Sequence, residues 1–149
     1  MSNRCVNLIR TKNIPNLDVF DNCEIIKGMR RQHLALGQRG EKIALGYLRE
    51  RGFQIIATNW HCREGEIDIV AEHEGIVRFI EVRTRSAETT ETAFESVQPR
   101  KRARLIAAAE HYVADHRLEN SAWCIDVLAI AIRRQGTPLI EYQEDALGW

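Results

Sequence analysis

Two apolar runs, residues 66–72 and 76–84, constrain the fold of this 149-residue chain more than any other segment. Both are rich in isoleucine and valine, which favour strands that pack inside a sheet. Each run nevertheless carries an acidic residue in its interior, Asp68 in the first and Glu81 in the second. A carboxylate is costly to bury unless it is paired, hydrogen-bonded or bound to a cation. The two runs therefore predict neighbouring strands that together hold a divalent cation.

The short segment between the two runs has the length and the glycine of a hairpin turn. With Glu74 and Gly75 as a two-residue turn, Asp68 lies directly opposite Glu81. Opposed residues have Cβ atoms about 4.5–5.5 Å apart, so the two carboxylates repel each other unless a proton or a cation lies between them. Mg²⁺ or Mn²⁺ suits such a pair, and the backbone carbonyl of Val82 offers a further oxygen ligand.

A hard divalent ion at this position indicates phosphodiester hydrolysis, because such an ion generates hydroxide near neutral pH and stabilises charge on phosphorus. Arg83 follows Glu81 by two residues and shares its strand face, where a cation would stabilise the developing negative charge. The residue types leave an alternative open. Asp68 and Glu81 could be solvated acids of an exposed strand edge, neutralised by Arg83 and Arg85.

Hydrophobic periodicity predicts two helices and five strands. The helices span residues 38–51 and 99–116, and the strands span residues 53–57, 66–72, 76–84, 123–132 and 139–142. We expect an exposed loop at residues 86–96, and we expect Asp126, inside the fourth strand, to be a structural acid that accepts hydrogen bonds. Two helices around a mixed sheet make an α/β sandwich, with an antiparallel hairpin and a second helix long enough for a parallel crossover.

Residues 1–36 show no sustained periodicity. We expect them to form an N-terminal extension, disordered or packed late, ahead of a single domain of residues 37–149. Met29 stands just before the first well-patterned segment, so a start there would make residues 1–28 a start-site artefact. No apolar run approaches the roughly 20 residues that cross a bilayer, and the start lacks the apolar segment of a secretory signal. We therefore expect a cytoplasmic protein without a membrane partner.

The four cysteines are widely scattered and form no Cys-x-x-Cys motif, so the sequence predicts no structural zinc site. His61 and Cys62 are adjacent, but neighbouring strand residues point to opposite faces. We expect reduced thiols without a structural role, and no function is assigned to His111.

The net charge is zero, with 21 basic and 21 acidic residues, which is unlike the basic composition of most strong DNA-binding domains. The start of the second helix is locally basic, with Arg100, Lys101, Arg102 and Arg104. Such a cluster is either a solvated helix face or a surface that contacts phosphates.

Several motifs in fixed order resemble the YraN-like family, an uncharacterised family of predicted endonucleases. They are Gly37-x-x-Gly40-Glu41, Gly65-Glu66-Ile67-Asp68-Ile69-Val70, Phe79-Ile80-Glu81-Val82-Arg83-Thr84-Arg85, Lys101 and Ile125-Asp126-Val127. The resemblance covers roughly residues 36–145. That family is assigned to the PD-(D/E)xK restriction-endonuclease-like fold and is similar to archaeal Holliday-junction resolvases.

The resemblance implies a restriction-endonuclease-like mixed sheet flanked by helices, in the order helix, three strands, helix, strand. It implies an endonuclease that uses Mg²⁺ or Mn²⁺ to hydrolyse DNA, branched or damaged, and it implies a homodimer as in the resolvases. The implied roles are metal binding for Asp68 and Glu81, an accessory acid for Glu41, the catalytic cation for position 83, and an approach to the site or to the DNA backbone for Gln98 or Lys101. Arg100 and Arg104 of the basic cluster would add phosphate contacts.

This chain departs from the family pattern at Arg83, where the pattern has lysine. Arginine is a planar cation that is effectively never deprotonated, so it clamps a phosphate but does not accept a proton. Activity would then be reduced, shifted to another residue, or lost. Three functions follow as alternatives: a metal-dependent endonuclease, a catalytically weakened or inactive nucleic-acid-binding module of the same fold, and an interaction domain without a nucleic-acid role.

Overall fold

The computed structural model describes residues 19–95 and 98–146. Its elements, in chain order, are α1 (Val19–Glu50), β1 (Gln54–His61), β2 (Glu66–His73), β3 (Ile76–Arg85), α2 (Glu91–Glu95), α3 (Pro99–Asp115), β4 (Trp123–Ala131) and β5 (Leu139–Gln143). The chain divides into two compact units, Met1–His33 and Leu34–Trp149, and the sheet belongs entirely to the second. Among the described helices, none combines the length and apolar character that a membrane crossing requires.

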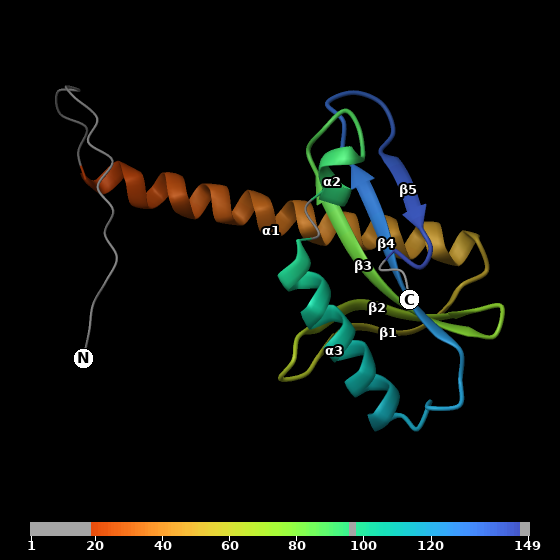
Figure 1. Cartoon of the computed structure of the whole chain (residues 1–149). Helices are drawn as coiled ribbons and strands as arrows, with labels where there is room; N and C mark the ends of the chain where they lie inside the picture. Colours follow the sequence, from red (N-terminus) through yellow and green to blue (C-terminus); the bar gives the residue numbers. More distant parts are fainter. Residues whose placement is uncertain (1–18, 96–97, 147–149) are drawn as a thin grey trace, which may run out of the picture. The chain divides into compact units, whose positions relative to one another are not determined.

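The five strands form one sheet in the order β1-β2-β3-β4-β5 (Figure 1). All neighbouring pairs are antiparallel except β3 and β4, which are parallel and are joined by the crossover through α2 and α3. The expected mixed α/β sheet between helices is confirmed, and it is consistent with a restriction-endonuclease-like fold.

The predicted hairpin register is also confirmed. Ile69 pairs with Ile80, and the ladder continues to the pair His73 and Ile76. Glu74 and Gly75 form the turn with φ values of 53° and 78°, the left-handed conformation that two-residue hairpin turns require. Asp68 and Glu81 occupy the next opposed positions, directly beyond the last ladder pair.

Each face of the sheet has its own apolar core. On one face α3 packs through Leu105, Ala108, Ala109, Tyr112 and Val113 against Ile67, Val70, Val77, Phe79 and Ile125. On the other, α1 packs through Ala44 and Leu48 against Phe53, Ile69, Ala71, Ile80, Leu128 and Ile130. The contact of α1 with β3 is closest at Gly40, where a Cβ atom would lie 1.8 Å from Thr84 Oγ1. Only glycine allows this approach.

Three sequence predictions about element bounds were wrong. Helix α1 begins at Val19, although its apolar stripe predicted a start at residue 38. The described side chains of residues 27–36 are mostly exposed, with Met29 at 54% and Leu34 at 65%, so this part of the helix has no apolar face to reveal it. Residues 1–18, the rest of the predicted extension, lie outside the described residues.

The other two differences are local. Strand β1 continues to His61 instead of ending near residue 57, because its ladder with β2 resumes after a register shift between Ile55 and Ala57. The expected loop at residues 86–96 contains α2 and buries Thr90 and Ala93. Five helical residues are too few to give a periodic signal.

Candidate metal and nucleic-acid site

Glu81 is the most deeply placed acid of the hairpin, with 1% of its surface exposed. It stands on the β3 face that carries Phe79, at the end of the apolar core beneath α3. Asp68, across the hairpin on β2, is half-buried, and its Oδ2 accepts a hydrogen bond of 2.8 Å from the backbone N–H of Val82. The two strands therefore place two acids side by side at the edge of the core.

Two cations approach the same oxygen of Glu81. Arg83 Nε lies 3.1 Å and Lys101 Nζ lies 3.3 Å from Glu81 Oε1. Glu81 Oε2 is buried and has no hydrogen-bond partner among the described residues. An unpaired buried carboxylate oxygen is costly, so this atom marks a position that an additional positive group would stabilise.

The protonation of the pair reflects its burial. Burial first, and then the negative charge of Glu81, raise the pKa of Asp68 to about 7 against the lowering effect of the hydrogen bond from the Val82 N–H. Burial also raises the pKa of Glu81, against the lowering effect of Lys101 and then of Arg83. The two acids therefore hold a proton at a pH where isolated carboxylates are ionised, unless a cation takes its place.

Glu41, on α1, contacts β1. Its Oε2 accepts a hydrogen bond of 3.4 Å from Asn59 Nδ2 on β1. On β1, Asn59 lies between Thr58, which pairs with Ile69, and Trp60, which pairs with Ile67, so its position is opposite Asp68 on β2. The neighbour of Glu41, Gly40, brings α1 against β3 at Thr84.

The side chains of the basic cluster at the start of α3 have different surroundings. Lys101 is half-buried and points into the site, where it also lies 3.6 Å from Glu66 Oε1. Arg104 donates from Nε to the backbone carbonyl of Glu64 at 3.3 Å and so joins α3 to the β1–β2 loop. Gln98 and Arg100 are exposed at the start of the helix.

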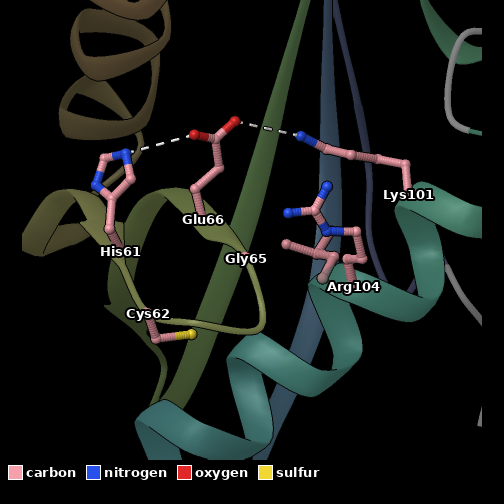
Figure 2. A pocket seen from close by; sticks show the side chains of 7 residues that line it. His61, Cys62, Gly65, Glu66, Lys101 and Arg104 are labelled. Carbon is pink, nitrogen blue, oxygen red and sulfur yellow. Dashed lines mark ion pairs between the residues drawn. The ribbon is translucent and has the colours of Figure 1, made fainter. Parts of the chain in front are cut away.

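A cavity of about 370 Å³ opens beside Lys101. It is lined by His61, Cys62, Gly65, Glu66, Lys101, Arg104 and Leu105. Figure 2 shows Glu66 between His61 and Lys101, with ion-pair distances of 3.4 Å and 3.6 Å. The cavity therefore lies between the start of β2 and the basic start of α3, and Lys101 contacts both Glu66 in its wall and Glu81.

Sequence reasoning missed one cluster near this wall. Ligand atoms of Cys62, Glu64 and His111 all lie within 4.8 Å of one another. The sequence indicated no partner for His111, but its Nδ1 lies 3.0 Å from Glu64 Oε2. The spacing of Cys62 and Glu64 was visible in the sequence, but their proximity to a helix residue far along the chain was not.

Comparison with known proteins identifies a single family. The family model described as "Uncharacterised protein family UPF0102" matches residues 40–130. A UPF0102 protein of Roseiflexus castenholzii is 45% identical over 105 residues, which cover 70% of this chain and 85% of that protein. One of Dehalococcoides mccartyi is 44% identical over 112 residues, covering 75% of this chain and 92% of that protein. One of Ralstonia nicotianae is 44% identical over 118 residues, which cover 76% of this chain and 87% of that protein.

Proposed function

Because this chain belongs to the UPF0102 family, as its YraN-like motifs indicated, we propose that it is a metal-dependent endonuclease that hydrolyses DNA phosphodiesters. The observation that supports this most strongly is the Asp68–Glu81 pair. Two neighbouring carboxylates in a largely buried site, one with an oxygen that has no hydrogen-bond partner, form an arrangement that a divalent cation would stabilise.

The donor atoms of the site fit Mg²⁺ or Mn²⁺. Asp68, Glu81 and the backbone carbonyl of Val82 would hold the ion, since these hard cations prefer oxygen ligands and retain several waters. When bound, the ion supplies a nucleophilic hydroxide and stabilises charge on the phosphate. The Val82 N–H contributes by fixing Asp68 Oδ2 at 2.8 Å, which orients this carboxylate before any ion arrives.

We assign the role of the family's lysine to Lys101. Its ammonium group lies 3.3 Å from Glu81 Oε1, although the residue comes from α3 and not from β3. Lysine can release and accept a proton, whereas arginine keeps its charge. Arg83, 3.1 Å from the same oxygen, would then bind a phosphate oxygen of the substrate as a fixed cation. With proton transfer assigned to Lys101 and phosphate binding to Arg83, hydrolysis would not require a lysine at position 83.

In this proposal, the protein contacts DNA outside the metal site only through the start of α3. The net charge of zero gives the protein no general attraction for nucleic acid, so Gln98, Arg100, Lys101 and Arg104 at the start of α3 would carry the phosphate contacts. Branched or damaged DNA is the proposed substrate class, because the family resembles junction resolvases. A homodimer acting in the cytoplasm is part of the same proposal, since two-fold junctions match two-fold proteins.

The test is cleavage of labelled junctions, flaps, duplexes and single strands with Mg²⁺, with Mn²⁺ and with a chelator. Cleavage should require the metal and fall about 100-fold or more in Asp68→Asn, which keeps the shape of the side chain and removes its charge. Cleavage equal in Asp68→Asn and the native chain would contradict the proposal. Binding without cleavage, with activity only after Arg83→Lys, would instead indicate an inactive nucleic-acid-binding module.

A further inference from the structure

The geometry points to a second metal site, for Zn²⁺, formed by Cys62 Sγ, Glu64 Oε2 and His111 Nδ1 where the β1–β2 loop meets α3. Their ligand atoms lie within 4.8 Å of one another. These three residues take no part in the proposed hydrolysis. Sulfur, imidazole nitrogen and carboxylate oxygen form a ligand set that suits Zn²⁺ and does not suit Mg²⁺.

The spacing of the ligand atoms is close to that of a zinc tetrahedron. With Zn–N and Zn–O bonds of about 2.1 Å, neighbouring ligand atoms are separated by about 3.5 Å. His111 Nδ1 and Glu64 Oε2 are 3.0 Å apart, so the insertion of an ion requires only a small separation of the two side chains. Three protein ligands would leave the fourth position to water.

The imidazole of His111 is already held as a zinc ligand usually is. Its Nε2 lies 3.5 Å from Asp115 Oδ2, one helical turn further along α3. In zinc sites a carboxylate commonly accepts the second ring N–H of a ligating histidine, which directs the other nitrogen to the metal. Trp60, whose ring centroid is 5.9 Å from that of His111, flanks the same imidazole.

A simple His111–Glu64 ion pair accounts for the cluster less well. His111 Nδ1 lies 3.0 Å from Glu64 Oε2, yet this buried oxygen has no hydrogen-bond partner among the described residues. The two atoms are therefore close without the angles of a hydrogen bond. Arg63 contacts the other oxygen, Oε1, and leaves Oε2 to the cluster. Cys62 is half-buried, forms no disulfide and offers its thiol at the same place.

A metal here would join two segments of the chain. It would link the β1–β2 loop to α3. The two segments already pack closely there, since a Cβ atom added to Gly65 would lie 3.2 Å from the backbone carbonyl oxygen of Arg104. Both segments line the cavity beside Lys101. The ion would therefore fix the wall of the cavity and the helix that carries Lys101, and it would stabilise the fold by binding only the folded state.

The experiment is titration of the metal-free, reduced full chain with Zn²⁺ and with Co²⁺ in excess Mg²⁺, read by equilibrium dialysis, Co²⁺ absorption and thermal unfolding. We expect one Zn²⁺ per chain, a thiolate-to-cobalt charge-transfer band and a raised Tm. His111→Gln and Cys62→Ser should each weaken Zn²⁺ binding about 100-fold or more. The Cys62→Ser variant should also lose the charge-transfer band.

His61→Gln is the matched control, because His61 adjoins Cys62 and lines the same cavity without belonging to the cluster. It should bind Zn²⁺ like the native chain, and so should Asp68→Asn, which separates this site from the proposed catalytic one. Absence of Zn²⁺ binding at micromolar concentration, or equal binding by the native chain, His111→Gln and Cys62→Ser, would overturn the proposal. A loss in His61→Gln as large as in His111→Gln would also overturn this ligand set.

Discussion

Glu81 on β3 and Asp126 on neighbouring β4 are both buried acids of the sheet, with exposed fractions of 1% and 0%. The protein surrounds Asp126 completely. Its Oδ2 accepts from Arg78 Nη1 at 3.3 Å and from the hydroxyl of Tyr142, and its Oδ1 accepts from the backbone N–H of Asp145 at 2.8 Å. The prediction of a structural, hydrogen-bonded Asp126 is confirmed.

Glu81 has a different environment. Arg83 and Lys101 both approach its Oε1, and Oε2 has no hydrogen-bond partner among the described residues. Burial alone therefore does not mark a functional acid. A buried carboxylate whose oxygens are all bound by the protein stabilises the fold, whereas one with an unbound oxygen is available to an external cation.

The largest effect should come from Asp126→Asn. Loss of the charge leaves Arg78 buried with only the exposed Glu144, 3.5 Å away, as an ionic partner, and we expect about 3–5 kcal/mol of lost unfolding free energy. Urea denaturation measures it. Glu81→Gln is the matched variant and should change stability by about 1 kcal/mol or less, because Arg83 and Lys101 are partly exposed and can be hydrated. Equal losses in the two variants would break the comparison.

Lys101→Met should lower metal-dependent cleavage about 100-fold, equivalent to about 2.7 kcal/mol of transition-state stabilisation, because the variant removes the ammonium beside Glu81. Arg100→Met is the control, since Arg100 is exposed on the same helix turn and should affect mainly the salt dependence of DNA binding. Steady-state cleavage at several salt concentrations separates the two. Full activity in Lys101→Met would refute the assignment of the lysine role.

The pH dependence of stability should reveal Asp68. Its pKa is raised to about 7 in the folded state, above the ordinary value near 4 of an unfolded chain, so the folded state binds the extra proton between these values. Without divalent ions, stability should therefore decrease as the pH rises from about 4 to about 7, by on the order of a few kcal/mol relative to Asp68→Asn. Mg²⁺ should reverse the decrease at pH 8 and have little effect at pH 5. A native chain that tracks Asp68→Asn across this range would contradict the raised pKa.

Tyr142→Phe should have the smallest effect, about 1–2 kcal/mol, because it removes one donor to Asp126 while Arg78 and the Asp145 N–H remain. Urea denaturation measures the loss, and cleavage by the variant should be unchanged at temperatures where it stays folded. A loss of cleavage at a temperature where the variant stays folded would show that Asp126 and Glu81 are coupled.

The parts of the fold that the sequence predicted well are those set by local rules. A two-residue turn and strict alternation determine the hairpin register, so the ladder from Ile69–Ile80 to His73–Ile76 was predicted correctly, and Asp68 and Glu81 are the next residues along the two strands. Pro99 and the apolar stripe gave the start and face of α3. Neither rule applies to residues 19–36 of α1, whose described side chains are mostly exposed, or to the five residues of α2.

The parts of the site that the sequence did not predict depend on contacts between distant segments. Periodicity placed Lys101 at the start of a helix, but its reach to Glu81 Oε1 depends on how α3 lies over β3. The meeting of His111 with Glu64 depends in the same way on how the β1–β2 loop folds against α3. The family resemblance implied an accessory acidic role for Glu41, and its contact with Asn59 leaves that role a prediction.

The metal site is tested most directly by a crystal structure of the protein grown with Mn²⁺, with anomalous scattering recorded at the manganese edge. We predict one anomalous peak bound by carboxylate oxygens of both Asp68 and Glu81, with Glu81 Oε2 among the ligands and Lys101 within hydrogen-bonding distance of the site. A structure without that peak, in which Arg83 and Lys101 still hold Glu81 as an ion pair at saturating Mn²⁺, would contradict it.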